Sequence, residues 1–372
     1  MLFLCLMKLK TECVDIMKIK EIFFSSRLFE FSMEVILWFR QRYESLKEAK
    51  QHFKTDKPDV GSFADFKSAN WKHRVTYSEY MYSYEYWKLN EEQRDEFVSS
   101  SEMRCIYRKL SDRNVRGLFF DKVRFLKEYH TFIHRQWSLA KDLSKEQFKL
   151  MIQQHDCIAK PVDGTQGKGV FKICADAVDD LDALYSKCVK EDLLIEECVQ
   201  ACDEIAAFHP SSLNTIRVVT FSSQDKCVVF GALFRMGAHG NVVDNTHAGG
   251  VYAPVNVETG TIEIDAIDAE NHHYSNHPDT GKPIKGFTIP YWEQILETCK
   301  AASLAVPNVR FAGWDICVTN DGRVELIEGN HAPDFDGGMQ APLKIGVKKK
   351  VQETVLDVMG VDPLKYISIW KY

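Results

Sequence analysis

The segment WDICVTNDGRVELIEGN, residues 314–330, contains two apolar runs that each carry an acidic residue near one end. Its central Thr319–Arg323 is a typical hairpin sequence, so the segment predicts two antiparallel strands. Glu328 and Asn330 are two positions apart and therefore share a face, and Asp315 on the facing strand can join them. We predict that three oxygen ligands converge here.

Magnesium is the metal that suits these three ligands. Mg²⁺ prefers a few carboxylate oxygens together with phosphate oxygens and water. The sequence lacks the spacing of a calcium-binding loop. We expect Asp315, Glu328 and Asn330 to hold metal together with the phosphates of a nucleotide.

A glycine-rich loop follows Lys160 far upstream. Glycines let backbone N–H groups approach an anion, and lysines add positive charge. The loop is not a Walker loop, because Val170–Ile173 predicts a strand where a P-loop needs a helix. Phosphate binding and a plain hairpin turn both remain open. The candidate phosphate ligands are Lys160, Gly164, Thr165, Gln166, Gly167, Lys168 and Gly169.

A third group begins with the apolar run Leu193–Val199, which contains Glu196 and Glu197. Such a run offers an apolar slot and main-chain hydrogen bonds for adenine, and Asp203 or Glu204 offers a carboxylate for ribose. A strand followed by a solvated acidic loop explains the same residues equally well.

Arg235 ends another predicted strand and precedes a polar segment with a Gly249-Gly250 bend. An arginine in this position can bind an anionic substrate or a developing oxyanion. A buried Arg–Asp ion pair is the alternative interpretation. We assign His247 to substrate binding rather than to general base catalysis, because a lone histidine is usually just hydrogen-bonded.

The composition indicates a globular protein with two or three domains: 372 residues, 45% hydrophobic and 27% charged. The net charge of −6, with both signs interspersed, argues against nucleic-acid binding. Eleven cysteines without a CxxC pair suit a reducing cytoplasm. Cys198 and Cys202 lack the second pair that a zinc site needs.

No targeting or membrane segment is expected. The apolar start Met1–Met7 is shorter than the core of a signal peptide, and no stretch approaches the length of a membrane span. An amphipathic helix is predicted from Arg27 to about Lys54, packed on the body of the protein rather than on a membrane. The tyrosine-rich stretch Tyr77–Trp87 is interpreted as core packing, with stacking on a sugar or base as the alternative.

The pattern predicts mainly helices up to residue 150 and β-rich structure after Ile158, an α+β protein. Predicted strands are Gly169–Ile173, Leu193–Glu197, Thr215–Phe221, Cys227–Phe234, Gly249–Val257, Ile262–Ile264, Trp314–Thr319 and Arg323–Glu328; predicted helices among them are Val178–Lys190 and Trp292–Ala302.

The ordered series of groups resembles the ATP-grasp superfamily. It consists of Lys122, then Lys160 before the glycine loop, then Glu196-Glu197, and then Asp315 thirteen residues before Glu328. Within that superfamily the chain is most similar to the sugar-transfer-associated ATP-grasp proteins. The motifs that carry this similarity are Ser212–Arg217, Arg235–Gly237, Val243–Asn245, Gly249–Val251, His277–Gly281, Ile289–Pro290 and Gly313–Asp315.

The resemblance implies an ATP-grasp fold, in which two α+β subdomains clasp ATP, with a mainly helical N-terminal region. The expected boundaries are 1–115 for the helical region, 116–345 for the ATP-grasp domain, divided into 116–212 and 213–345, and 346–372 for a C-terminal helix or tail. One departure from the family pattern is Gly329, where ATP-grasp chains commonly carry an apolar residue.

The resemblance also implies the roles of individual residues. Two Mg²⁺ ions would bind Asp315, Glu328 and Asn330. The residues expected at the nucleotide are Lys122 and Lys160 at the phosphates, Glu196 with the Glu197–Val199 backbone, including Cys198, at adenine, Leu326 in the pocket, and Asp203 or Glu204 at ribose. Lys160, Arg235 and Glu328 are the expected catalytic residues, and Arg217, Asp244, Asn245, His247, Gly249 and Gly250 are expected to bind substrate.

The implied activity is an ATP- and Mg²⁺-dependent ligase that joins a carboxylate to an amine through an acyl phosphate, in cell-surface polysaccharide synthesis. One alternative is a phosphotransferase acting on a glycan. Another is a nucleotide-binding scaffold that recruits glycosyltransferases. The expected substrates are small or glycan-linked acids and amines.

Overall fold

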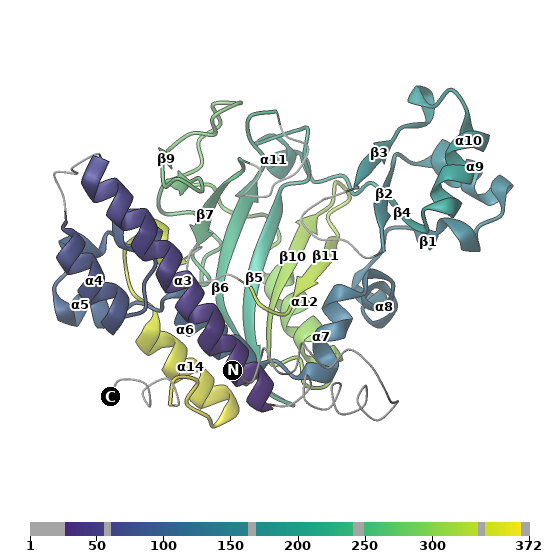
Figure 1. The fold of residues 1–372 in the computed structure, drawn as a ribbon. Helices are drawn as coiled ribbons and strands as arrows, with labels where there is room; N and C mark the ends of the chain where they lie inside the picture. The colour runs from purple at the N-terminus through teal and green to yellow at the C-terminus, as the bar shows by residue number, and fades with distance from the viewer. Residues whose placement is uncertain (1–26, 56–60, 163–168, 241–248, 334–338, 366–372) are drawn as a thin grey trace.

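The computed structural model describes residues 27–55, 61–162, 169–240, 249–333 and 339–365. It contains two antiparallel sheets flanked by helices (Figure 1). The smaller sheet has four strands in the order β1-β4-β2-β3, and the larger has seven in the order β11-β10-β5-β6-β7-β8-β9. This mixture of helix and antiparallel sheet confirms the α+β class.

As predicted, helices dominate up to residue 150, and strands β2 to β11 follow. The helices are α3 Arg27–Thr55, α4 Phe63–Lys72, α5 Glu91–Asp95, α6 Ser100–Leu110, α7 Arg113–Phe120, α8 Lys122–Glu128, α9 Lys145–Gln154, α10 Leu181–Lys190, α11 Asp203–Ala206, α12 Trp292–Ala305, α13 Ala341–Leu343 and α14 Lys348–Met359. The strands are β1 Trp137–Leu139, β2 Cys157–Pro161, β3 Phe171–Ile173, β4 Leu193–Glu197, β5 Thr215–Ser222, β6 Cys227–Met236, β7 Val251–Val255, β8 Ala266–Ile267, β9 His273–Tyr274, β10 Phe311–Val318 and β11 Val324–Asn330.

The N-terminal helices form a core of their own, in which aromatic side chains dominate. Tyr77, Tyr80, Tyr84 and Tyr86 are at most 1% exposed and pack with Phe66. This confirms core packing as the role of the tyrosine-rich stretch. The long helix α3 confirms the helix predicted from Arg27, and its contacts with α4 and α6 hold it on the body of the protein.

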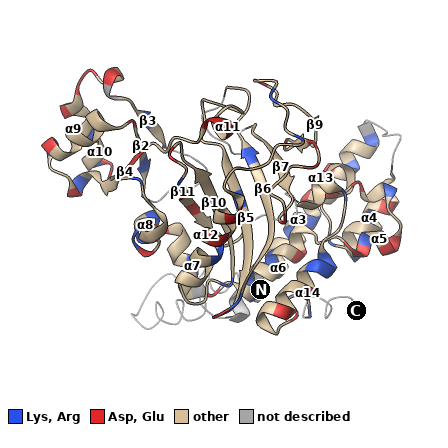
Figure 2. Cartoon of the chain, turned by 180° about the vertical axis from the view of Figure 1, so that it is seen from behind, with Lys and Arg blue, Asp and Glu red and all other residues tan. Residues whose placement is uncertain are grey.

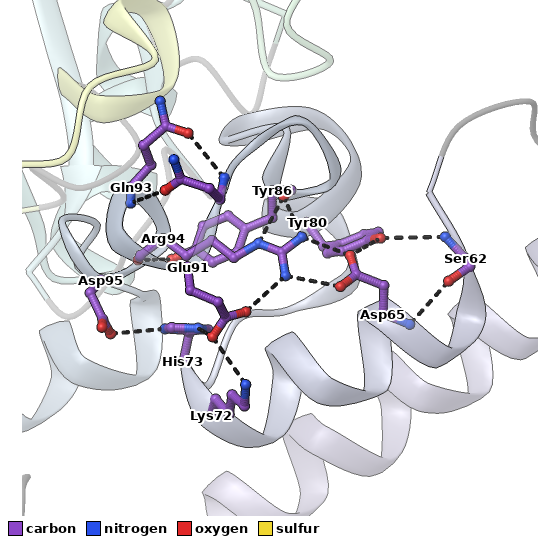
Figure 3. Close-up of polar contacts among 11 residues, drawn as sticks. Ser62, Asp65, Lys72, His73, Tyr80, Tyr86, Glu91, Gln93, Arg94 and Asp95 are labelled. Carbon is purple, nitrogen blue, oxygen red and sulfur yellow. Dashed lines mark hydrogen bonds and ion pairs between the residues drawn. The ribbon is translucent and has the colours of Figure 1, made fainter.

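A buried arginine organises the polar side of this core (Figure 3). Arg94 donates from Nη1 and Nη2 to the two carboxylate oxygens of Asp65 at 2.9 and 2.7 Å. It also donates to the carbonyl oxygen of Tyr86 and forms an ion pair with Glu91. Asp65 further accepts a hydrogen bond from the Tyr80 hydroxyl at 2.7 Å. The network ties α4 and α5 together.

Replacement of Asp65 by Asn is expected to destabilise the protein at neutral pH and to have a much smaller effect in acid. The hydrogen bond from Arg94 is the main reason that the pKa of Asp65 is lowered. The stability that Asp65 contributes is therefore complete above its unfolded pKa of about 3.9 and is lost as the pH falls through the lower folded pKa. Urea unfolding of both proteins between neutral pH and about pH 3 measures this difference, and a difference that is constant with pH would contradict the assignment.

The small sheet supports the glycine loop. Strands β2 and β3 pair in antiparallel register from Cys157↔Ile173 to Ala159↔Phe171, which confirms that the loop connects two strands. Helices α9 and α10 pack against the sheet through Phe148, Ile152 and Cys188.

The large sheet has a different cover on each face. Helix α12 packs with the face that carries Trp314 and Ile316. Helices α6 and α14 cover part of the opposite face, where Phe311 lies in their hydrophobic cluster. The same face carries Asp315, because residues 311, 313 and 315 of one strand point the same way. Apolar packing thus fills one part of this face, and charged side chains occupy another.

One predicted strand is wrong. Ile262–Ile264 is not a strand, and the strand of this region is β8, two residues later. Ile262 instead exchanges backbone hydrogen bonds with the irregular segment that contains Gly286 and Phe287. Its buried side chain explains why the apolar pattern suggested a strand. The short strand β1 was not predicted, since three residues are too few to show alternation.

Residues of both charge signs are spread over the helices and strands of the chain (Figure 2). Among the helices in the described ranges, none is both long and apolar enough to cross a bilayer.

Candidate functional site

The three predicted metal ligands lie together at the β10–β11 pair. Asp315 is directly opposite Glu328, and Gly313 is opposite Asn330. Cross-strand partners share a face, so the three oxygen-bearing side chains point to the same side of the sheet. The Asn330 amide donates to Glu328 Oε1 at 3.5 Å.

Two arginines neutralise Asp315, which is 4% exposed. Arg217 lies opposite Asp315 on β5 and donates to both of its carboxylate oxygens, with Nη2 at 2.8 Å from Oδ2. Arg235 on β6 donates from Nη1 to Oδ2 at 3.0 Å. Burial alone would raise the pKa of Asp315, but the two arginines outweigh it and the pKa is lowered. The Arg–Asp ion pair, one of the two interpretations of Arg235, is present, and the oxyanion role stays a prediction.

Glu328 has the opposite electrostatic setting. Its side chain is accessible to solvent, yet the protein around the carboxylate removes part of its hydration, which raises the pKa of Glu328. The negative charge of Asp315 raises it further. Arg217, Lys160 and Arg235 act against these two causes without cancelling them. A cation between the two carboxylates would relieve their repulsion.

Lys160 lies on β2 of the small sheet, and its Nζ forms an ion pair with Glu196 Oε2 on the adjacent strand β4. Glu196 is 4% exposed. Burial alone would raise the pKa of Glu196, but Lys160 and Arg135 outweigh it and the pKa is lowered. Glu196 also binds Arg135, which donates to the carbonyl oxygen of Ile327 next to Glu328. The phosphate-binding candidate of one sheet therefore lies near the metal-binding candidates of the other.

The side chain of Lys122 reaches the start of the glycine loop. It occupies the first position of α8, and its Nζ is 3.1 Å from the carbonyl oxygens of both Pro161 and Val162. Gly169 at the far end of the loop has φ of 75°, and a Cβ there would lie 2.9 Å from Pro161 Cγ, so only glycine fits. The other predicted loop ligands, Gly164, Thr165, Gln166, Gly167 and Lys168, lie outside the described residues.

The predicted adenine segment is already engaged in main-chain bonding. The backbone amide of Glu197 donates to the backbone carbonyl oxygen of Gln136 at 2.9 Å, and that of Cys198 donates to the backbone carbonyl oxygen of Asp156 at 2.8 Å. Glu197 Oε2 also accepts from the Gln136 amide at 3.0 Å. These two amides are therefore engaged within the protein, and contact of adenine with the rest of the Glu197–Val199 backbone stays a prediction. Asp203 and Glu204, the ribose candidates, are both exposed at the start of α11.

Leu326 is not where the pocket prediction needs it. Its side chain is fully buried in the hydrophobic core behind the sheet. The pairing register shifts between Asp315↔Glu328 and Ile316↔Leu326, which leaves Ile327 as an extra residue, a β-bulge. The bulge turns Leu326 away from the face that carries Glu328.

The same bulge creates a contact that sequence reasoning missed. Glu325 lies opposite Cys317 and so faces the same side as Asp315. In a regular strand, residues 325 and 328 would point to opposite faces. Glu325 is 1% exposed and forms an ion pair at 2.7 Å with Arg135, a buried residue with no recognisable motif. The sequence offered one signal for Glu325, namely that it is a charged residue inside an apolar run.

The substrate candidates divide between described and undescribed residues. Gly249 and Gly250 immediately precede β7, and Gly249 has φ of 92°, whereas Asp244, Asn245 and His247 lie outside the described residues. The family motifs Arg235–Gly237 and His277–Gly281 contact each other: His277 Nε2 is 2.7 Å from the Gly237 carbonyl oxygen. His209 Nδ1 is 2.8 Å from Ser212 Oγ, in the loop before β5.

Gly329 departs from the family pattern because aromatic rings fill the space of its side chain. A Cβ at this position would lie 2.7 Å from both Phe119 Cε1 and Phe125 Cε2. These rings belong to α7 and α8, the helix pair that carries Lys122 at its junction. The apolar residue of other chains is thus replaced by an apolar contact from outside the strand.

Replacement of Gly329 by Ala is expected to lower the free energy of unfolding by about 1–3 kcal/mol, because overpacking forces the rings to move. Gly117→Ala is the matched control: it lies on α7, and its Cβ would meet only Arg124 Nη1 at 3.8 Å. There alanine should stabilise the helix by about 0.5–1 kcal/mol. Denaturant titration of both variants measures the effect, and equal stability of the two would show that the rings accommodate the methyl group.

The donor set fits a divalent cation that prefers oxygen ligands. Asp315, Glu328 and Asn330 supply two carboxylates and an amide oxygen on one face. A cation there would relieve the repulsion from Asp315, which adds to burial in raising the pKa of Glu328. A second, separate group of possible ligands consists of Asp268, Glu270 and His272, whose ligand atoms lie within 4.8 Å of one another. The Asp268 carboxylate there already accepts hydrogen bonds from His272 and Tyr274.

The fold is that of an α+β protein in which two sheets bring lysines and carboxylates near one another. The chain belongs to the sugar-transfer associated ATP-grasp family, whose sequence profile matches residues 92–355. This confirms the family resemblance and the ATP-grasp fold. No curated protein matched the chain significantly.

Similar solved structures include the ATP-grasp ligase PsnB complexed with a minimal precursor, with TM-score 0.40, 16% identity, and coverage of 67% of this chain and 64% of that chain. Another is D-alanyl-alanine synthetase A from Vibrio cholerae O1 biovar eltor, with TM-score 0.37, 12% identity, and coverage of 66% and 65%. The chain spans less than two thirds of the length of either. These TM-scores are too low to carry an inference about activity.

Proposed function

We propose that the protein is an ATP- and Mg²⁺-dependent ligase that joins a carboxylate to an amine through an acyl phosphate. The observation that carries this proposal is a chain of contacts between the sheets: Lys160 pairs with Glu196, and Glu196 binds Arg135, which donates to the Ile327 carbonyl oxygen next to Glu328. Together with family membership, it supports one triphosphate held between the sheets.

Each charged residue has a distinct task in this proposal. Lys160 and Lys122 bind phosphate oxygens and so orient the triphosphate. Asp315, Glu328 and Asn330 would hold Mg²⁺. When bound, the ion would neutralise the charge of the phosphates and the charge that develops on the leaving group. Positioning and charge neutralisation are the main requirements of phosphoryl transfer.

The arginines next to Asp315 are assigned to the substrate in this proposal. Arg217 and Arg235 would bind the substrate carboxylate, one oxygen of which attacks the γ-phosphorus as ADP leaves. The amine then attacks the acyl carbon, phosphate leaves, and the nitrogen loses a proton to give the amide. Arg235 is proposed to stabilise the tetrahedral oxyanion of this second step.

The setting proposed for this reaction is cell-surface polysaccharide synthesis in the cytoplasm, with glycosyltransferases as partners. The family description links its members to sugar transfer, and the cysteine content suits a reducing compartment. The acid and the amine would then be sugar-linked or amino-acid groups.

The test is mass spectrometry of the products formed from ATP, Mg²⁺ and extracts of surface-glycan precursors. The proposal expects an amide product together with ADP and free phosphate. ADP formed without any amine, with phosphate retained on the product, would favour a phosphotransferase. Nucleotide binding without turnover across a panel of acids and amines would favour a scaffold.

A further inference from the structure

Arg135 connects the two sheets through every hydrogen-bond donor of its side chain. A guanidinium has five N–H groups. Nε and Nη2 donate to Glu196 Oε1 at 3.2 and 3.0 Å, and Nη1 donates to Glu325 Oε1 at 2.7 Å. The remaining two bonds reach the carbonyl oxygens of Leu326 and Ile327 at 2.8 and 3.0 Å.

These partners belong to different sheets. Glu196 lies on β4 of the small sheet, and the others lie on β11 of the large sheet. Arg135 is 9% exposed, and both carboxylates are more deeply buried. The His134 amide completes the arrangement by donating to Glu325 Oε2 at 2.9 Å. A buried charge with this many directional bonds fixes the position of its partners.

Each end of the contact leads to one half of the nucleotide site. Glu196 uses one oxygen for Arg135 and the other for Lys160. Leu326 and Ile327 are the residues at the β-bulge of β11, which interrupts the regular ladder and turns Glu328 toward Asp315. Arg135 thus contacts the supports of both the lysine and the carboxylate.

We propose that Arg135 is a positioning residue that aligns the two halves of the nucleotide site, orienting Lys160 through Glu196 and Glu328 through the bulge of β11. The inference rests on the proposed function, which assigns Lys160 and Glu328 to the same nucleotide. Arg135 itself has no role in contacting the substrate in this proposal.

Arg135→Lys is the decisive substitution because it keeps the charge and removes the planar fork. A lysine carries three donors on one nitrogen and cannot reach two carboxylates and two carbonyl oxygens at once. Arg94→Lys is the matched control. Arg94 is also buried and also bonds carboxylates and a carbonyl oxygen, but all within the N-terminal helical region.

Two readouts separate positioning from mere stability. The first is the affinity for a non-hydrolysable ATP analogue with Mg²⁺, measured by calorimetry beside the melting temperature. The second is hydrogen–deuterium exchange of peptides that cover 193–199 and 324–330. For Arg135→Lys we expect affinity about tenfold or more weaker, as for the loss of a buried hydrogen-bonded charge contact, and faster exchange in both peptides. Arg94→Lys should melt earlier but keep the affinity and the exchange of wild type.

Wild-type affinity in Arg135→Lys, or equal losses of affinity in both variants, would overturn the proposal. If Arg135→Lys does not fold, Glu325→Gln tests the same contact, because it removes one charged arm and leaves Glu196 with Lys160. Faster exchange in 193–199 in that variant supports the coupling, and exchange confined to 324–330 refutes it. If wild type itself binds no nucleotide, the proposed function fails, while the exchange data still decide the coupling of the sheets.

Discussion

Glu328→Gln is expected to lower turnover of ATP by well over tenfold while leaving the fold intact. Glutamine keeps the shape of the side chain but removes a charge aimed at the metal and phosphates, and such losses typically cost about 3 kcal/mol in the transition state. Steady-state ADP release measures the effect.

The melting temperature of this variant provides an independent check. The pKa of Glu328 is raised, so its ionised form costs stability in the folded protein. Removal of the charge should leave the melting temperature unchanged or higher. Glu353→Gln is the control, since Glu353 is exposed on α14, and neither property should change. Full activity in Glu328→Gln would remove Glu328 from the mechanism.

Lys160→Ala is expected to weaken nucleotide binding by about tenfold or more, because a desolvated lysine–phosphate contact is lost. Some stability should be lost as well, since Glu196 is buried and, among the described residues, keeps Arg135 as its charged partner. The loss of affinity, measured with a fluorescent ATP analogue, should exceed what the change in melting temperature explains.

Lys141→Ala serves as the control for this experiment. Lys141 precedes α9, near the same small sheet, and its ion pair with Asp192 is exposed, so that little stability depends on it. Nucleotide affinity should remain that of wild type. A Lys160→Ala protein that unfolds more easily but binds the nucleotide normally would identify Lys160 as a structural residue.

The sequence predicted the local parts of the site well. The hairpin signal at Asn320-Asp321-Gly322 and the apolar runs around it predicted the antiparallel strand pair that carries Asp315 and Glu328. The glycine loop was correctly expected between two strands, and the strand Leu193–Glu197 has its predicted limits. These features depend on neighbours in the chain, which period and turn chemistry encode directly.

The parts that could not be predicted depend on distant residues. One extra residue at Ile327 reverses the direction of Leu326, and nothing in the alternation of VELIE reveals a bulge. Arg135 has no neighbouring motif, and its partners Glu196 and Glu325 lie 61 and 190 positions away. The exclusion of a side chain at Gly329 likewise requires the rings of α7 and α8.

The most direct test of the account is the structure of the protein crystallised with Mg²⁺ and a non-hydrolysable ATP analogue. We expect one triphosphate between the sheets, with Lys160 on a phosphate oxygen and with Asp315, Glu328 and Asn330 on Mg²⁺ bound to the same phosphates. A nucleotide bound elsewhere, or one that contacts only one of the two sheets, would contradict it.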